Sequence, residues 1–289
     1  MIDDLPPKTP TARRERFRAV LEGPGCVHPA SVWDAMSARI AWDLGFEVGI
    51  LAGSTASLAV LGAPDLIVLT LTELAEQARR IGRAACLPLL VDADHGYGNA
   101  LNVMRTVQEL EAAGVAALTI EDTDLPRPFG QVGARLLPLD EGIGKIKAAL
   151  AARVDPALVV VARTGALAAT GLVDALARIR AYAALGADAI FLTGLQDQAQ
   201  LGAIAGAVNL PLIIAGPNDP GLQALPGVRI RLQGHQPIMA AVQAVYATLK
   251  ALRDGVPPAS LPGLPTEALM RQVTRSEDYD GWTQRFLQG

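Results

Sequence analysis

The chain has 289 residues, of which 51% are hydrophobic and 4% aromatic, and its formal net charge at pH 7 is −4. This length fits either two average domains or a single α/β barrel of about 250 residues, and the aliphatic composition is typical of alternating strands and helices. The negative charge disfavours a general nucleic-acid binder. No apolar run is long enough to span a membrane. The two cysteines, Cys26 and Cys86, are too few for a disulfide framework.

Short apolar runs alternate with longer helical stretches along the chain. A first helix is predicted at 13–21, before the helix-breaking Gly23-Pro24-Gly25. Eight strand candidates follow, at 26–28, 48–52, 87–94, 116–121, 158–162, 189–192, 211–215 and 228–232. The helices predicted between and after them lie at 33–44, 72–85, 99–113, 139–152, 173–185, 196–208 and 237–252.

Continuous apolar strands separated by helices are typical of a parallel sheet whose outer face is covered by those helices. Eight such units predict an α/β fold of the closed (β/α)8, or TIM, barrel type. An open doubly wound sheet is the alternative, but no Gly-x-Gly-x-x-Gly sequence opens an early helix. We therefore expect a barrel.

The last part of the chain differs from this repeat. Gly255-Val256-Pro257-Pro258 is typical of a linker, and the helical stretch 266–286 carries Trp282 and Phe286. We therefore predict a barrel with its N-terminal helix in residues 1–254 and a linker with a helical tail in residues 255–289. The first residues lack the basic-then-apolar pattern of a signal peptide, which predicts a cytoplasmic location.

A motif at the end of the third predicted strand reads Leu-Leu-Val-Asp-Ala-Asp-His-Gly-Tyr-Gly-Asn. Asp92 and Asp94 are expected to point to the same face, because side chains alternate along a strand. Gly96 and Gly98 permit a tight turn after them. Two carboxylates at a strand end indicate Mg²⁺ or Mn²⁺. On its own, the Asp-x-Asp pattern favours acids that cap and solvate a turn.

Other strand ends also carry polar groups, and in a barrel the carboxyl ends of the strands form the active-site face. Small residues after the second strand expose backbone N–H groups that can hold an anion. Several acids placed together would repel one another without a cation. The residues at these ends are Gly53, Ser54, Asp65, Glu121, Asp122, Arg163 and His235.

Three motifs occur here in the order and spacing of a known superfamily. Val-Asp-Ala-Asp-His-Gly-Tyr-Gly-Asn, Leu-Thr-Ile-Glu-Asp and Val-Ala-Arg-Thr resemble those of the isocitrate lyase/phosphoenolpyruvate mutase superfamily, and the likeness runs from about residue 31 to 252. His95 and Gln233-Gly234-His235 are similar to the oxaloacetate decarboxylase branch. The resemblance implies a barrel whose eighth helix is swapped between paired subunits, in a homotetramer built as a dimer of dimers.

The resemblance also implies roles for individual side chains. Asp92 would bind Mg²⁺, or Mn²⁺ in its place, directly. The cation's water molecules would be held by Asp65, Asp94 and Glu121. The carboxylate and keto oxygens of a small 2-keto dicarboxylate would be bound by Gly53, Ser54 and Arg163.

One loop departs from the superfamily pattern. The carbon–carbon lyases carry Lys-Lys/Arg-Cys-Gly-His after strand four, where this chain reads Pro-Arg-Pro-Phe-Gly-Gln. Phe129 stands in place of the cysteine and cannot exchange a proton, which disfavours cleavage of isocitrate or 2-methylisocitrate. Arg127 is the one basic residue nearby for a phosphoryl group, which disfavours phosphonopyruvate chemistry.

These observations favour Mg²⁺-dependent decarboxylation of oxaloacetate, or of a 3-alkyl oxaloacetate, to pyruvate and CO₂ through a metal-stabilised enolate. His235 is the candidate acid for carbon three or an orienting group, with an exposed turn histidine as the alternative. The alternative functions are another lyase of the superfamily, a phosphonopyruvate-processing enzyme, and a non-catalytic dicarboxylate-binding barrel. A site without catalytic activity has no physical need for clustered acids, which disfavours the non-catalytic dicarboxylate-binding barrel.

Overall fold

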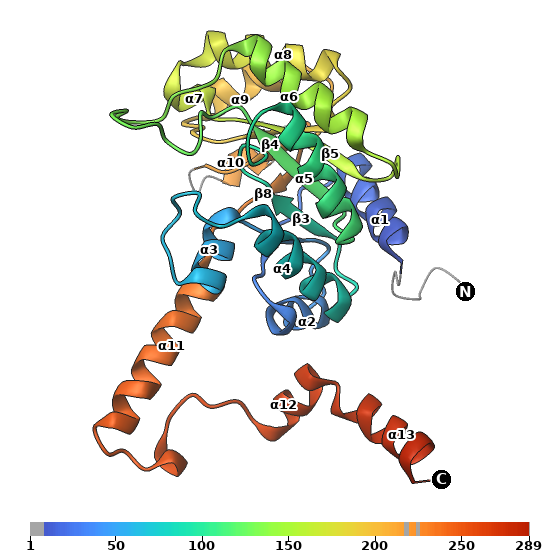
Figure 1. Cartoon of the computed structure of the whole chain (residues 1–289), viewed down its shortest axis with the longest axis vertical. Coiled ribbons are helices and arrows are strands. Elements are labelled where there is room, and N and C mark those ends of the chain that lie inside the picture. Colours follow the sequence, from blue (N-terminus) through green and yellow to red (C-terminus); the bar gives the residue numbers. More distant parts are fainter. Residues whose placement is uncertain (1–8, 217–219, 224–225, 289) are drawn as a thin grey trace. The chain divides into compact units, whose positions relative to one another are not determined.

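A computed structural model describes residues 9–216, 220–223 and 226–288 (Figure 1). The chain divides into two compact units between Gly234 and His235. The first unit holds the sheet, and the second begins with the helix that follows the last strand. The division predicted at residue 254 stays a prediction about the protein's domains.

The first unit contains one sheet of eight parallel strands, which lie in chain order (Figure 1). Its strands are β1 (Ala30–Ser31), β2 (Gly49–Leu51), β3 (Leu89–Asp92), β4 (Ala117–Glu121), β5 (Val159–Thr164), β6 (Ala189–Leu192), β7 (Leu212–Ile214) and β8 (Val228–Arg231). Val27, ahead of β1, forms a parallel bridge with Ile230 of β8. The Val27 N–H donates to Arg229 at 2.9 Å, and its carbonyl accepts from Arg231 at 3.0 Å. The first and last strand segments thus meet, which confirms the predicted barrel.

One helix precedes the first strand, and helices follow most of the strands, as the alternation of the sequence predicts. They are α1 (Pro10–Glu22), α2 (Ala35–Asp43), α3 (Gly53–Leu61), α4 (Leu71–Ala84), α5 (Ala100–Ala112), α6 (Leu139–Ala152), α7 (Ala166–Ala169), α8 (Leu172–Ala184), α9 (Gln198–Ala205) and α10 (Pro220–Gln223). Asn99 caps α5, because its side-chain oxygen accepts the N–H groups of Leu101 and Asn102 at 2.9 and 3.4 Å. This cap fixes where the loop after β3 ends.

The strands separate two hydrophobic clusters. Along β5, Val159 and Val161 belong to one cluster, while Val160 and Ala162 belong to the other. This alternation follows from the two-residue period of a strand, which sends successive side chains to opposite faces. The larger cluster contains the helix residues that cover the sheet, and the smaller one includes the fully buried Phe17 of α1. The barrel is therefore packed on both faces of its sheet, which leaves the strand ends to carry polar groups.

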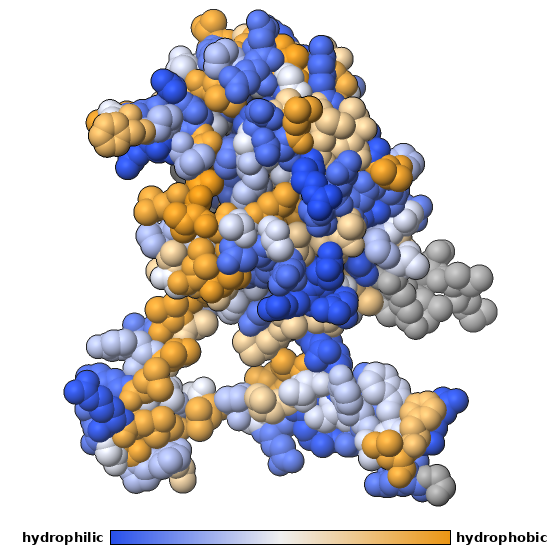
Figure 2. Space-filling model, in the orientation of Figure 1, coloured by the Kyte–Doolittle hydropathy of each residue, from blue (hydrophilic) through white to orange (hydrophobic). Residues whose placement is uncertain are grey.

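The second unit contains α11 (Gln236–Arg253), the 3₁₀ turn η1 (Pro258–Ser260), α12 (Glu267–Thr274) and α13 (Ser276–Leu287). Apolar residues recur along α11 at helical spacing, and Figure 2 shows hydrophobic side chains along it. Those that are exposed are Met239, Val242, Val245, Tyr246, Leu249 and Leu252. Among the described residues, no helix is both long enough and apolar enough to cross a membrane.

Candidate active site at the carboxyl ends of the strands

The loop between β3 and α5 contains a tight turn. Strand β3 ends at Asp92, so the predicted strand to residue 94 is too long by two residues. Asp94 and Tyr97 have φ angles of 48° and 61°, and Gly96 and Gly98 have φ angles of 77° and 146°. A Cβ atom at Gly96 would lie 2.5 Å from a methyl group of α5, so glycine is required there. The direction of the Asp94 side chain is therefore set by this turn rather than by strand alternation.

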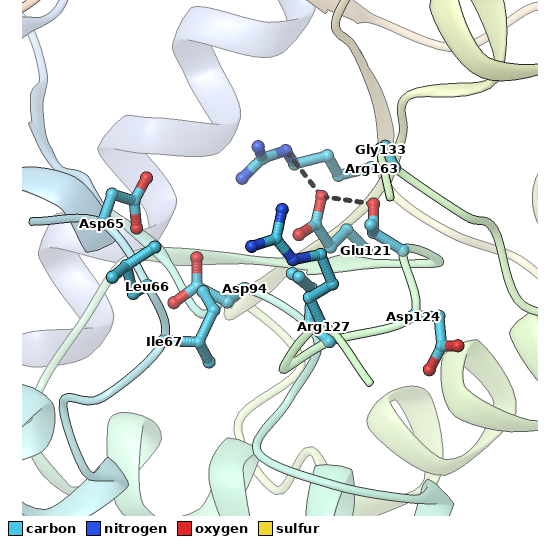
Figure 3. A pocket seen from close by; sticks show the side chains of 12 residues that line it. Asp65, Leu66, Ile67, Asp94, Glu121, Asp124, Arg127, Gly133 and Arg163 are labelled. Atoms are coloured by element: carbon cyan, nitrogen blue, oxygen red, sulfur yellow. Dashed lines mark hydrogen bonds and ion pairs between the residues drawn. The ribbon is translucent and has the colours of Figure 1, made fainter. Parts of the chain in front are cut away.

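A cavity of about 390 Å³ opens where β3, β4 and β5 end (Figure 3). Residues from the loops after β2, β3 and β4 and from the end of β5 form its walls. Its charged side chains are Asp65, Asp94, Glu121, Asp124, Arg127 and Arg163. Three of the four acids that the sequence assigned to the cation thus line one cavity together with the predicted arginine, whereas Asp92 is not among the residues that line it.

Arg163 connects the acids of two neighbouring strands. Its Nη1 donates to Oδ2 of Asp92, and its Nε lies 3.4 Å from Oε2 of Glu121 (Figure 3 draws the second pair). Asp92 also accepts a hydrogen bond from Thr119 Oγ1 at 2.7 Å. Both oxygens of this buried carboxylate therefore have a donor, and the guanidinium is held by two acids.

Asp94 lies against the beginning of α3. A Cβ atom at Gly53 would lie 2.7 Å from Asp94 Oδ1, so a larger residue at position 53 would displace this carboxylate. Ala52, at the N-cap, gives α3 no side-chain acceptor. The amides at Gly53 and Ser54 therefore start a helix without a side-chain cap, and such a helix end favours negative charge.

The carboxylates of the cavity repel one another in spite of Arg163. Burial raises the pKa of Asp94 well above its usual value, and the Asp92 and Glu121 carboxylates raise it further, while Arg163 opposes them. Burial also raises the pKa of Glu121, again against the effect of Arg163. For Arg163 itself, burial lowers the pKa, but Asp92 and Glu121 outweigh it and raise the pKa overall. A bound cation would relieve this repulsion.

The donor set fits a hydrated divalent cation. Carboxylate oxygens are the ligands that Mg²⁺ prefers, and Mg²⁺ keeps several of its water molecules when it binds. Within the described ranges, no three acidic, histidine or cysteine side chains are grouped closely enough to bind one ion together. A cation bound here would keep several water molecules, and the carboxylates of the cavity would accept hydrogen bonds from them.

Asp122 does not join the acids of the cavity, although the sequence places it directly after Glu121. Its buried Oδ2 accepts hydrogen bonds from Tyr182 Oη at 2.7 Å, Arg178 Nη1 at 3.0 Å and Thr164 Oγ1 at 3.1 Å. The prediction that Asp122 stands with the acids at the strand ends is wrong for this reason. It instead joins β4 and β5 to α8 through a buried polar network.

Two further side chains of the cavity come from the segment after β4. Thr123 Oγ1 donates to Glu121 Oε2 at 3.1 Å, and Arg127 lines the cavity. Thr123 follows Glu121 at the two-residue spacing of a strand, a signal that the sequence did offer.

Gly53 and Ser54 lie at the start of α3, and His235 stands directly before α11 in the second unit. The role of His235 stays a prediction.

Comparisons with known proteins agree with this architecture. A family model described as phosphoenolpyruvate phosphomutase matches residues 17–253. A Bradyrhizobium diazoefficiens protein named oxaloacetate decarboxylase is 58% identical over 271 residues, which cover 92% of this chain and 94% of the relative.

Solved structures of related enzymes superpose on nearly the whole chain. Oxaloacetate acetylhydrolase in complex with the inhibitor 3,3-difluorooxalacetate has a TM-score of 0.85 at 28% identity, covering 96% of this chain and 98% of that chain. Phosphonopyruvate hydrolase in complex with oxalate and Mg²⁺ has a TM-score of 0.83 at 31% identity, covering 95% and 99%. From its strand order, its acidic strand ends and these matches, the chain belongs to the phosphoenolpyruvate phosphomutase family of the isocitrate lyase/phosphoenolpyruvate mutase superfamily.

Proposed function

We propose that this protein is a carboxy-lyase that decarboxylates oxaloacetate, or a 3-alkyl oxaloacetate, to pyruvate and CO₂. The observation that carries the proposal is the cavity in which Asp65, Asp94 and Glu121 stand with Arg163 and Arg127. The identity of 58% to a relative named oxaloacetate decarboxylase supports the same reaction.

The reaction needs a site that stabilises negative charge on one oxygen. When the bond between carbons three and four breaks, CO₂ leaves and the electron pair becomes an enolate at carbon two. A divalent cation, Mg²⁺ or Mn²⁺, would supply Lewis-acid stabilisation of this charge. We assign the cation to Asp92, with its water molecules held by Asp65, Asp94 and Glu121.

Arg163 would add a fixed positive charge beside the developing enolate. Its pairs with Asp92 and Glu121 hold the guanidinium in one orientation, so little reorganisation is needed when charge develops. The uncapped amides of Gly53 and Ser54 would bind the carboxylate of carbon one. These groups would keep the keto acid in the plane that the enolate requires.

Arg127 suits the second carboxylate of the substrate. Figure 3 shows its guanidinium reaching toward the space between Asp94 and Glu121, and it lines the same cavity as both. Arg127 forms no ion pair within the described part of the chain, so its donors are available to a planar carboxylate. This assignment explains why a dicarboxylate would be preferred to a keto acid with one carboxylate.

Protonation of carbon three completes pyruvate, and we assign this step to His235, as acid or as orienting group. Imidazole is the side chain whose ordinary pKa lies closest to neutral pH. Turnover of oxaloacetate by His235→Gln tests the assignment. A large fall in kcat with little change in KM supports it, and unaltered turnover removes His235 from the mechanism.

Exposed apolar residues in the second unit support an assembly of several copies. The apolar stripe of α11 defined above is exposed, and burying it against a second copy would stabilise a swapped eighth helix. We propose a homotetramer built as a dimer of dimers, in the cytoplasm. The molar mass in solution, measured by light scattering after gel filtration, tests the assembly.

The competing activities of the superfamily lack their chemical groups here. Phe129, at the position of the lyase cysteine, is a fully exposed side chain with no proton to exchange. Purified protein with Mg²⁺ should be given oxaloacetate, methyloxaloacetate, methylisocitrate and phosphonopyruvate in parallel. Turnover confined to the first two supports the proposal, and turnover of methylisocitrate or phosphonopyruvate alone overturns it.

A further inference from the structure

The β3–α5 loop, residues 93–98, has a backbone that needs external support. Asp94 and Tyr97 both have positive φ angles, in the left-handed region that residues with a side chain rarely adopt. Such conformations persist only where the surrounding structure fixes them. Because the loop carries the Asp94 carboxylate of the cavity, the groups that fix its backbone also fix the position of that carboxylate.

Four consecutive carbonyl oxygens of the loop accept hydrogen bonds from four different groups. The donors and acceptors are Gly96 N to Ala93 O at 2.9 Å, Glu121 N to Asp94 O at 2.9 Å, Lys145 Nζ to His95 O at 2.8 Å, and Thr106 Oγ1 to Gly96 O at 3.0 Å. Two of these donors are side chains, one from α5 and one from α6. They reach the loop from helices that pack against each other.

Lys145 is a charged residue at a buried position of α6. It is 3% exposed, and burying an ammonium group costs more than burying an apolar side chain of the same size. Burial lowers the pKa of Lys145, although Glu141 and Glu121 oppose the shift. Packing alone would be served by methionine, so the charged donor is best explained by the carbonyl of His95 that it holds.

We propose that Lys145 is a positioning residue of the cation site. By fixing the His95 carbonyl it keeps the strained turn closed and directs the Asp94 carboxylate into the cavity. Thr106 supports the same turn from α5 through the next carbonyl. This inference rests on the proposed function, since it assigns Asp94 to a divalent cation. Without the donor, the turn relaxes and the carboxylate loses its direction.

Binding of Mn²⁺ alone, measured by titration calorimetry without substrate, tests the inference. Lys145→Met removes the ammonium and keeps the length of the side chain. Lys147→Met is the matched control, because Lys147 is exposed two residues further along α6. We expect the Kd for Mn²⁺ to rise about tenfold or more in Lys145→Met, the size usual for groups that orient ligands. Lys147→Met should bind Mn²⁺ as the wild type does.

A second pair of variants keeps the test decisive if Lys145→Met fails to fold. Thr106→Val removes the hydroxyl donor at nearly constant volume, whereas Thr106→Ser retains it. Weaker Mn²⁺ binding by Thr106→Val, with recovery in Thr106→Ser, supports the inference. A folded Lys145→Met, or in its place a folded Thr106→Val, that binds Mn²⁺ like the wild type overturns it. Failure of the wild type to bind Mn²⁺ overturns the cation site of the proposed function itself.

Discussion

Arg163 of β5 donates a hydrogen bond to Asp92 of β3, and so reaches across β4, the strand that lies between them. On the way its Nε lies 3.4 Å from Glu121, which is its register partner in β4. One guanidinium therefore ties together the ends of three adjacent strands. Its charge is held in place by the same acids that we assign to the cation and its water.

Replacing Arg163 by lysine keeps one positive charge but loses the planar fork that contacts two acids at once. We expect kcat for oxaloacetate decarboxylation to fall by about 100-fold, the usual effect of losing one preorganised charge-stabilising donor. Steady-state pyruvate formation measures it. Arg180→Lys, at an exposed position of α8, is the control and should keep full activity. Normal kcat in Arg163→Lys would contradict the role given to the fork.

Asp94→Asn separates cation binding from stability. Because the carboxylates of Asp92 and Glu121 repel that of Asp94, removing the charge of Asp94 should raise the melting temperature of the metal-free protein by a few degrees. The same change should weaken Mn²⁺ binding by about tenfold or more. Thermal unfolding with and without Mn²⁺ measures both effects.

Asp124→Asn is the control for this experiment, because Asp124 lines the same cavity but is paired with Arg135. It should not raise the melting temperature of the metal-free protein. If Asp94→Asn lowered that temperature instead, repulsion between the acids of the cavity would not destabilise the metal-free protein.

Arg127→Ala should affect substrates according to their second carboxylate. We expect the KM for oxaloacetate to rise about tenfold, the loss of roughly one charge-assisted hydrogen bond. Oxalate mimics the planar enolpyruvate product and leaves the place of the departing carboxylate unfilled, so its inhibition constant should not change. The KM for oxaloacetate and the inhibition constant of oxalate, measured on the same preparations of wild type and Arg127→Ala, test this prediction. An equal loss for both molecules would place Arg127 elsewhere in the mechanism.

Asp155 contributes stability that depends on pH. Burial raises its pKa, but hydrogen bonds from Arg14 at 2.6 Å, the Ala157 N–H at 2.9 Å and Thr11 at 2.8 Å outweigh burial and lower the pKa below 3.8. A lowered pKa stabilises the folded state above the unfolded value, and this contribution is lost as the pH falls through the folded value. Asp155→Asn should therefore be less stable than the wild type at pH 7.

The difference between wild type and Asp155→Asn should shrink as the pH falls below 3.8. Urea unfolding at several pH values measures it, with Glu47→Gln as a control at an exposed position. A difference that stays constant from neutral to acidic pH would show that Asp155 acts through packing rather than charge.

The sequence predicts the barrel well because its strands are regular. Apolar runs such as 158–162 mark buried strands, and the acids and Arg163 follow those runs at the ends that a parallel sheet brings together. Strand order and the general place of the cavity both follow from this pattern. The outer limits of the strands follow less well, as the end of β3 at Asp92 rather than at Asp94 shows.

The directions of individual side chains depend on contacts that local pattern does not contain. Asp94 takes its direction from a left-handed φ angle, and Asp122 turns toward Arg178 and Tyr182, which are more than 50 residues away. The Lys145 donor that holds the turn is likewise 50 residues from His95. Sequence periodicity places a residue on one face only within a regular helix or strand. Contacts between residues this far apart in the sequence are therefore seen only in the folded structure.

Decarboxylation of oxaloacetate by the purified protein with Mg²⁺ tests the proposed reaction most directly. The rate of a protein-free mixture must be subtracted, because a divalent cation alone can polarise a keto acid. We predict that pyruvate and CO₂ form in equal amounts at a rate proportional to the protein concentration. This activity should be lost on adding EDTA and restored by excess Mg²⁺. A rate no higher than that of the protein-free mixture at every protein concentration would contradict this prediction.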